Sequence, residues 1–357
     1  MSTFDGNNFY FSGQGVVLIG NRDSNGRAAG LIPVGNVSAL KLGLAATTLE
    51  HKESQTGNRA IDLRLITELK STLSMTIENF SAVGLASALA GSSSIIAAGS
   101  VTTGNDIPKL YVGKVSPLNR IGVSTVVVKR GTGTPSTLAL YTNDSTAYDY
   151  KLNATAGSIM LNDGAIAAAP FSAITTTNTA ITAPTTITPG ATTVFTWAAT
   201  PPTQFSTAGV GGKFVVSGVT GTDAAALNNK AHTITAIDLS AKTVTVSTTV
   251  GAGALTCTSA LFFVDGEASD ITYAYSVQHR VDAMTSLSTE KYMRFEGLNT
   301  ADGGNPVIVE VFRFIVDPLK ELALIGEGIG PFVLDGNTLS DPLQSSGSKF
   351  FKVTLLR

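Results

Sequence analysis

Hydrophobic and polar residues alternate along much of the chain, and this pattern predicts β-strands. In the segments 232–237 (His-Thr-Ile-Thr-Ala-Ile) and 242–246 (Lys-Thr-Val-Thr-Val), apolar residues recur at every second position. Successive side chains of a strand point to opposite faces, so this period gives one buried and one solvated face. A long strand is expected at 63–80. Further strands are expected at 16–22, 40–44, 109–116, 123–129, 137–142, 157–161, 214–216, 271–275, 292–296, 307–316, 331–334 and 349–355.

Helical signals are few. One main helix is predicted over residues 80–90, where Asn79 or Ser81 can cap the N-terminus and Gly91 can end the helix. A second, short helical turn is expected at 318–325, after a proline stops the preceding strand. The predicted fold class is therefore mainly β, a β-sandwich or barrel with one flanking α-helix.

Charge is distributed unevenly and suggests two domains. Not one charged side chain occurs from Gly164 to Gly212. We therefore interpret residues 164–266 as an inserted all-β domain, a small sandwich or barrel, within a discontinuous host domain of residues 1–163 and 267–357.

Composition narrows the functional classes. The 357 residues are 43% hydrophobic but only 14% charged, compared with about 25% charged in ordinary globular proteins. The net charge of −2 excludes a basic protein that coats nucleic acid, since such proteins need many cations. The high hydrophobic content also argues against disorder.

The sequence shows no recognisable catalytic or metal-binding pattern. The single cysteine, Cys257, excludes an internal disulfide and a cysteine-based zinc site. His51, His232 and His279 lack the spacing of metal ligands, and no phosphate-binding loop or nucleophile elbow occurs. We expect no enzyme activity, no cofactor and no metal. A glycosidase is a distant alternative, because no pair of catalytic carboxylates is marked.

Four segments, taken in order, resemble the major tail tube protein of phages, of the siphophage type. They are GVVLIGNRDSNGRAAGLIPVGNVSALKLGL, ATTLEHKESQTGNRAID, STLSMTIENFSAVGLASALAG and NPVIVEVFRFIVDPLKELALIGEGIGPFVLDGNTLSDP. The order is a strand pair, a polar loop, a strand leading into a helix, and late strands. The resemblance covers about residues 10–163 and 267–357 and not the insert. An added immunoglobulin-like or other β domain is a known decoration of such proteins.

The resemblance implies a structural virion protein. Tail tube subunits form hexameric rings that stack into a helical assembly, whose inner sheets join into one β-barrel. This tube conducts DNA during viral genome ejection. The implied partners are further copies of the chain, a tape-measure protein, a tail terminator and a distal tail protein. Double-stranded DNA would pass through the lumen without specific binding, and no membrane is involved. The protein would be assembled in the host cytoplasm and reside in the phage tail.

The resemblance also implies roles for particular residues. The loop 46–62 would stack one ring on the next, although an ordinary solvated loop is an equal alternative on the residues alone. Its mixed charges suit a contact in which charge complementarity sets register. The stacking candidates are Glu50, His51, Lys52, Glu53, Arg59 and Asp62.

A DNA conduit is expected to have acidic or neutral walls, because cations would bind phosphate. The lumen-facing candidates are Glu68, Glu78, Glu296 and Glu310, although for any single one of them an ordinary solvent-facing carboxylate is the more common explanation. Exposure of aromatic side chains to water is unfavourable, so the aromatic residues near the N-terminus are expected to contact a neighbouring subunit or the host sandwich. These residues are Phe4, Phe9, Tyr10 and Phe11. That N-terminal stretch lacks a basic start followed by an apolar run, so we expect no signal peptide.

The insert is expected to project outward, since about a hundred residues cannot fit a narrow lumen. It could bind glycans through Phe195 and Trp197, but a tryptophan in a small β domain is usually a core residue. The alternative function for the whole chain is a phage receptor-binding or decoration protein built of tandem β domains.

Overall fold

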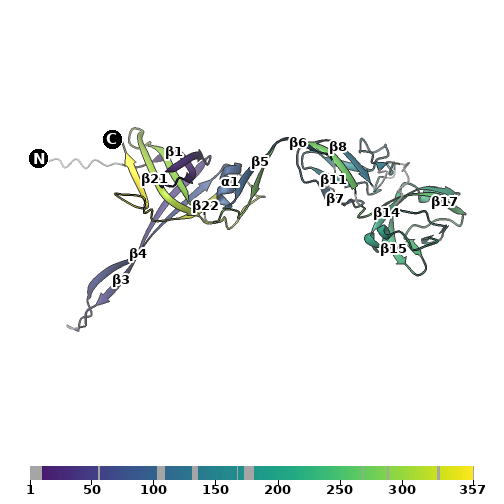
Figure 1. The fold of residues 1–357 in the computed structure, drawn as a ribbon, viewed down its shortest axis with the longest axis horizontal. Helices are drawn as coiled ribbons and strands as arrows, with labels where there is room; N and C mark the ends of the chain where they lie inside the picture. Colours follow the sequence, from purple (N-terminus) through teal and green to yellow (C-terminus); the bar gives the residue numbers. More distant parts are fainter. Residues whose placement is uncertain are drawn as a thin grey trace. The chain divides into compact units, whose positions relative to one another are not determined.

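The computed structural model describes residues 10–54, 57–102, 109–130, 136–166, 168–172, 181–267, 269–287, 289–327 and 330–356. Antiparallel strands dominate it, together with two short α-helices, so the predicted mainly β class is confirmed (Figure 1). The chain divides into two compact units. The first comprises the residues up to Ile96 and from His279 onward, and the second comprises Ala97–Gln278.

The first unit is built on one eight-stranded sheet. The strand order is β2-β1-β20-β21-β22-β4-β3, and β23 pairs with the other part of β21. These strands are β1 (Gly13–Arg22), β2 (Ala28–Pro33), β3 (Val37–Lys52), β4 (Ile61–Ile77), β20 (Lys291–Asn299), β21 (Asn305–Val316), β22 (Phe332–Thr338) and β23 (Phe351–Leu355).

The core of the first unit gathers alternate residues from these strands, among them Val17, Met75, Met293 and Phe314. Each is almost completely buried, as the period of two predicted.

The predicted main helix is α1 (Ala82–Ala88). Ser81 is its N-cap, because its hydroxyl accepts a 3.1 Å hydrogen bond from the amide of Gly84. The helical turn expected at 318–325 is absent from the described residues. The segment is instead an irregular connection held against α1, because the amide of Leu319 donates to the carbonyl of Ala88, one of the carbonyls that the end of a helix leaves unpaired. No helix in the described part of the chain is long and apolar enough to cross a membrane.

A two-stranded ladder of β5 (Ser92–Ile96) and β19 (Gln278–Asp282) lies where the chain passes between the two units. Beyond it, Gly99 pairs with Tyr275. The second unit is therefore entered and left through neighbouring strands.

Two small sheets form a sandwich in the second unit. Its core includes Leu110, Val128, Ile159, Ile271 and Tyr273. Only short parts of the strands expected at 109–116 and 137–142 form, because much of this backbone hydrogen-bonds in turns and isolated bridges. The sheets contain β6 (Gly99–Val101), β18 (Ser269–Tyr275), β8 (Val123–Arg130) and β9 (Ser136–Thr137), and β10 (Tyr150–Asn153), β11 (Ser158–Leu161) and β7 (Val115–Pro117).

The segment expected to be an inserted domain contains a closed six-stranded barrel in the order β12-β13-β16-β15-β14-β17. An immunoglobulin-like sandwich would keep two separate sheets, so the barrel alternative describes this segment better. The strands are β12 (Thr186–Thr188), β13 (Thr193–Thr196), β14 (Lys213–Gly221), β15 (Lys230–Asp238), β16 (Thr243–Val246) and β17 (Leu255–Val264). Two short helices, α2 (Thr203–Ala208) and the 3₁₀ turn Ala224–Ala226, accompany them.

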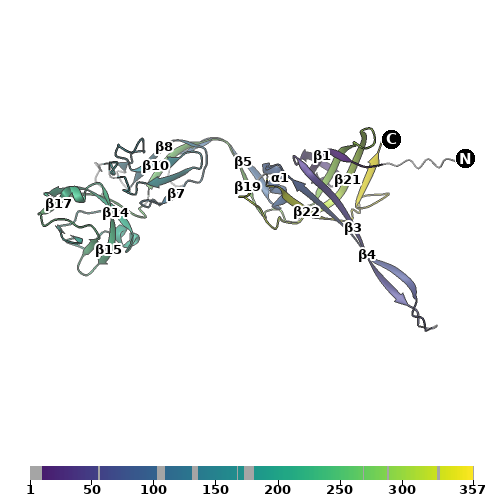
Figure 2. The same ribbon diagram turned by 180° about the vertical axis from the view of Figure 1, so that it is seen from behind.

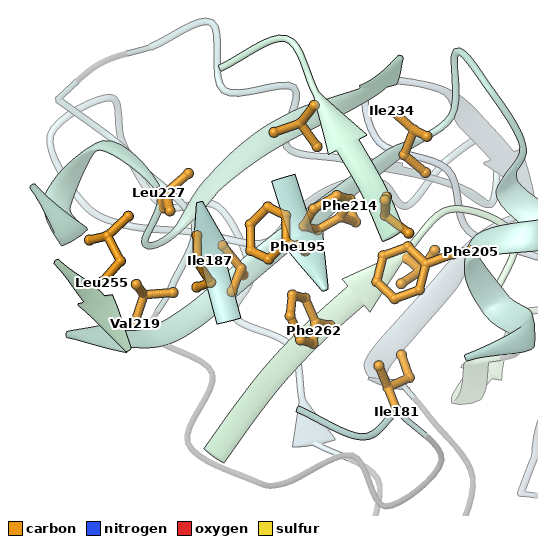
Figure 3. Close-up of a cluster of buried hydrophobic side chains, with 14 of the residues drawn as sticks. Ile181, Ile187, Phe195, Phe205, Phe214, Val219, Leu227, Ile234, Leu255 and Phe262 are labelled. Carbon is orange, nitrogen blue, oxygen red and sulfur yellow. The ribbon is translucent and has the colours of Figure 1, made fainter. Parts of the chain in front are cut away.

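Aromatic side chains fill the barrel (Figure 3). Phe195 makes edge-to-face contacts with Phe214 and Phe262, whose ring centroids lie 5.4 and 6.2 Å away. Trp197 is buried beside Phe205 and donates its indole N–H to the carbonyl of Thr182 at 2.9 Å. Trp197 and Phe195 are thus core residues, as expected from the usual position of tryptophan in a small β domain. Neither ring is available to bind a glycan.

The barrel and the sandwich share one compact unit. The buried Asp265 accepts hydrogen bonds of 2.8 and 2.9 Å from the amides of Val112 and Lys213. Val112 lies between β6 and β7 of the sandwich, and Lys213 is the first residue of β14 of the barrel. Val215 and Phe263 of the barrel join the sandwich core. Residues 97–163 and 267–278, expected in the host domain, therefore group with the barrel.

Candidate assembly surface

Strands β3 and β4 extend far beyond the rest of their sheet. Strand β22 pairs with β4 only over Ser71–Ile77, so residues 61–70 of β4 have only β3 as a partner. We call residues 45–54 and 57–70 the β3–β4 arm. Ten residues of strand correspond to about 30 Å. Figure 1 and Figure 2 show this ribbon leaving the first unit by itself.

The sequence predicted a loop at 46–62, and this prediction is wrong for most of the segment. The strands continue to Lys52 and resume at Ile61, and of the described residues between them, 53–54 and 57–60 lie outside the strands. A ribbon exposed on both faces carries no simple alternation of polar and apolar residues, so the strand signal is lost there.

The arm exposes apolar side chains on both of its faces. Leu49 pairs with Leu65 on one face, and neighbouring pairs place Leu69 and Ile66 on the other. Leu44 at the base of the arm is 72% exposed and Ile66 is 64% exposed. An isolated two-stranded hairpin is marginally stable in water, and large exposed apolar patches mark interaction sites. The arm therefore has the properties of a surface that another chain covers.

Charged residues concentrate toward the tip of the arm. The six stacking candidates lie at the end of β3, in the connection and at the start of β4. His51 Nδ1 lies 2.7 Å from Asp62 Oδ1, and this hydrogen bond lowers the pKa of Asp62. Arg64 lies 3.8 Å from Glu50. Such exposed pairs contribute little to stability and more to the register of a contact.

The four lumen candidates are not gathered in one place. Glu68 is an exposed residue of the arm, whereas Glu78 follows β4 and accepts a 2.7 Å hydrogen bond from Asn36. Glu296 on β20 pairs with Arg294 at 2.7 Å.

Glu310 on β21 belongs to a polar network, and its side chain is only 12% exposed. It contacts Arg294 at 3.0 Å, Lys352 at 2.7 Å and the hydroxyl of Tyr292 at 2.9 Å. Burial alone would raise the pKa of Glu310, but the hydrogen bonds from Lys352 and Tyr292 outweigh burial and lower it. The acids and bases of this sheet face therefore largely neutralise one another.

Of the N-terminal aromatic residues, Phe4 and Phe9 lie outside the described residues. Tyr10 and Phe11 have highly exposed side chains. The backbone beside them is held in place, because the side-chain amide of Asn299 donates to the carbonyl of Tyr10 at 2.9 Å. These rings are thus presented to solvent next to β20.

Comparison with known proteins places the chain in a family. A family model described as "Protein of unknown function UCP028589" matches residues 10–196 and 206–354. The chain belongs to this family. No curated protein matches it. The matched residues include the β3–β4 arm and all six strands of the barrel.

An ionic cluster in the first unit was missed by sequence reasoning. Arg22 pairs with Glu290 at 2.6 Å and with the fully buried Asp341 at 2.8 Å, and Arg313 also contacts Glu290. This ionic cluster joins β1, β21 and the segment before β23. Its members are single charges separated by tens to hundreds of residues, so no local motif could have identified it.

The side chains of His232 and Cys257 are accounted for by their surroundings in the fold. His232 is buried between the hydroxyl of Thr248 at 2.6 Å and the carbonyl of Leu227 at 2.7 Å. Burial raises the pKa of the Cys257 thiol to about 11. Within the described ranges, no three His, Cys, Asp or Glu side chains come together in a way that could hold a metal ion.

Proposed function

We propose that this protein is a structural subunit that polymerises through its β3–β4 arm. More specifically, we propose that it is the major tail tube protein of a siphophage-type tail. The observation that carries the proposal is the arm, a ribbon of about 30 Å with exposed apolar side chains on both faces. A chain that remained monomeric would leave this ribbon uncovered in water.

The edges of the main sheet support the same proposal. The sheet ends at β2 and β3, and β23 adds an edge with the exposed side chains of Val353 and Leu355. Unpaired edges invite pairing with another chain, and closure into a ring removes them. Hexameric rings would close the edges laterally, and the arms would connect successive rings along a helical assembly.

The electrostatics are compatible with a DNA conduit. The chain has a net charge of −2, and Arg294 and Lys352 on the sheet are paired with carboxylates. Cations neutralised in this way bind phosphate weakly, so DNA could slide through the tube during genome ejection. In this role the protein is not an enzyme. Its partners are its own copies, a tape-measure protein, a tail terminator and a distal tail protein within the virion.

Electron microscopy of the purified protein over a concentration series tests the proposal. Hollow rings or tubes that become more abundant with concentration are the expected result. Uniform monomers at every concentration, also after addition of a tail-tip complex as a seed, would contradict it. That outcome would favour the receptor-binding or decoration protein instead.

A further inference from the structure

The end of the β3–β4 hairpin opposite to the arm carries a groove. At this end Ile77 of β4 lies beside Val37 and Phe332, and Val333 lies beside Thr76. The two ends of the connection from β21 to β22, residues 317–321, 323 and 331, border the groove. Its apolar lining residues are Pro318, Leu319, Ala323, Pro331, Phe332 and Val333.

Large exposed apolar side chains lie close in sequence to the residues of this groove or to the end of β4. Ile325 is 97% exposed, and Leu324 and Phe80 are also highly exposed. Leu324 and Ile325 directly follow the lining residue Ala323, whereas Phe80 follows the end of β4. A loop that presents two adjacent apolar residues to water has the composition of a binding surface.

We infer that the arm of one copy binds in this groove of the next copy. The inference rests on the proposed polymerisation and names the receptor surface for the arm. A contact that repeats along a filament joins two different surfaces of the subunit. The arm and the groove lie at opposite ends of one hairpin, so their association places successive copies head to tail. The reach of the arm, about 30 Å, is close to the diameter of a small domain.

The charges at the tip of the arm are complementary to those of the groove. Lys52 and Arg59 at the tip of the arm form no ion pair with any described residue. The groove offers the carboxylates of Glu321 and Asp335, which are exposed and likewise have no ion-pair partner among the described residues, beside the single cation Lys320. Opposite charges across the contact would set the orientation of the arm in the groove.

Apolar-to-acidic variants test the receptor surface. In the double variant Leu324→Asp and Ile325→Asp, the critical concentration for assembly should rise by about tenfold or more, because two apolar contacts become desolvated charges. The thermal midpoint of the monomer should not change, since these side chains are exposed. Leu239→Asp is the matched control, an exposed leucine of the second unit whose replacement should leave assembly unchanged.

Charge reversal provides an independent measurement. Lys52→Glu with Arg59→Glu should weaken assembly, and adding Glu321→Lys with Asp335→Lys in the same chain should restore it. Normal assembly of the Leu324/Ile325 variant, or absence of rescue by charge reversal, would overturn the assignment of the groove and leave the proposed function standing. Failure of the unaltered protein to assemble, even with a seed, would overturn both.

Discussion

The Nδ1 atom of His51 lies 2.7 Å from the Oδ1 atom of Asp62, across the tip of the β3–β4 arm. Both side chains are largely exposed, so this contact cannot stabilise the fold appreciably. It joins the last residues of β3 to the first residues of β4 at the point where the ribbon reverses. The pair therefore organises the part of the molecule that we propose enters a neighbouring subunit.

Asp62 should titrate below the ordinary aspartate pKa of 3.8, because the hydrogen bond from His51 favours the carboxylate. A group with a lowered pKa contributes its stabilisation above the ordinary value and loses it as the pH falls through the lowered value. The arm tip should thus stay ordered in mild acid. NMR titration of the Asp62 carboxyl carbon measures this midpoint, and in His51→Ala it should return toward 3.8. An unchanged midpoint in this variant would show that the contact does not form in solution.

Leu65 and Met75 lie on the same strand, but their substitution should have opposite consequences. Leu65→Asp changes an exposed residue of the arm, so the free energy of unfolding should change by no more than about 0.5 kcal/mol while assembly is lost. Met75→Ala empties a buried position and should lower the free energy of unfolding by about 2–5 kcal/mol. Urea denaturation and sedimentation velocity distinguish the two effects. Assembly of Leu65→Asp at the normal concentration would argue against the role of the arm.

Asp265 should be important for the stability of the second unit. Asp265→Ala would leave the buried amides of Val112 and Lys213 without their acceptors, at a cost of about 2–4 kcal/mol. Asp270→Ala, on the partly exposed face of β18, is the control and should cost much less. The free energy of unfolding obtained from the transition of the second unit measures the cost of each substitution. Equal effects of the two substitutions would mean that Asp265 does not link the barrel to the sandwich.

The second unit should be removable. Its chain ends leave through the β5–β19 ladder, so Ile96 and His279 can be joined by a short Asn-Gly turn in place of residues 97–278. The shortened protein should unfold cooperatively and still form rings or tubes, because the sheet and the arm are intact. Circular dichroism and electron microscopy check these outcomes. A shortened chain that folds but no longer assembles would show that the second unit takes part in the contacts.

Local patterns in the sequence determined the mainly β class, most of the strands, the helix after β4 and its Ser81 cap. Each depends on neighbouring residues, through the period of side-chain burial or a hydrogen bond three residues away. The sequence also indicated that Trp197 belongs to a core. The alternation of Leu40 to Leu44 predicted a strand there but not how far it continues, because the exposed arm places apolar side chains on both faces.

Only the tertiary structure decided the contacts between distant residues. The amide of Leu319 donates to the carbonyl of Ala88 and so ties the segment expected to be a helical turn to the end of α1, and Asp265 joins the barrel to a segment 153 residues earlier. The division of the chain at Ile96 and Gln278 likewise follows from which strands pack together. Burial and pairing depend on what a residue meets in space, and a one-dimensional pattern of polarity does not contain that information.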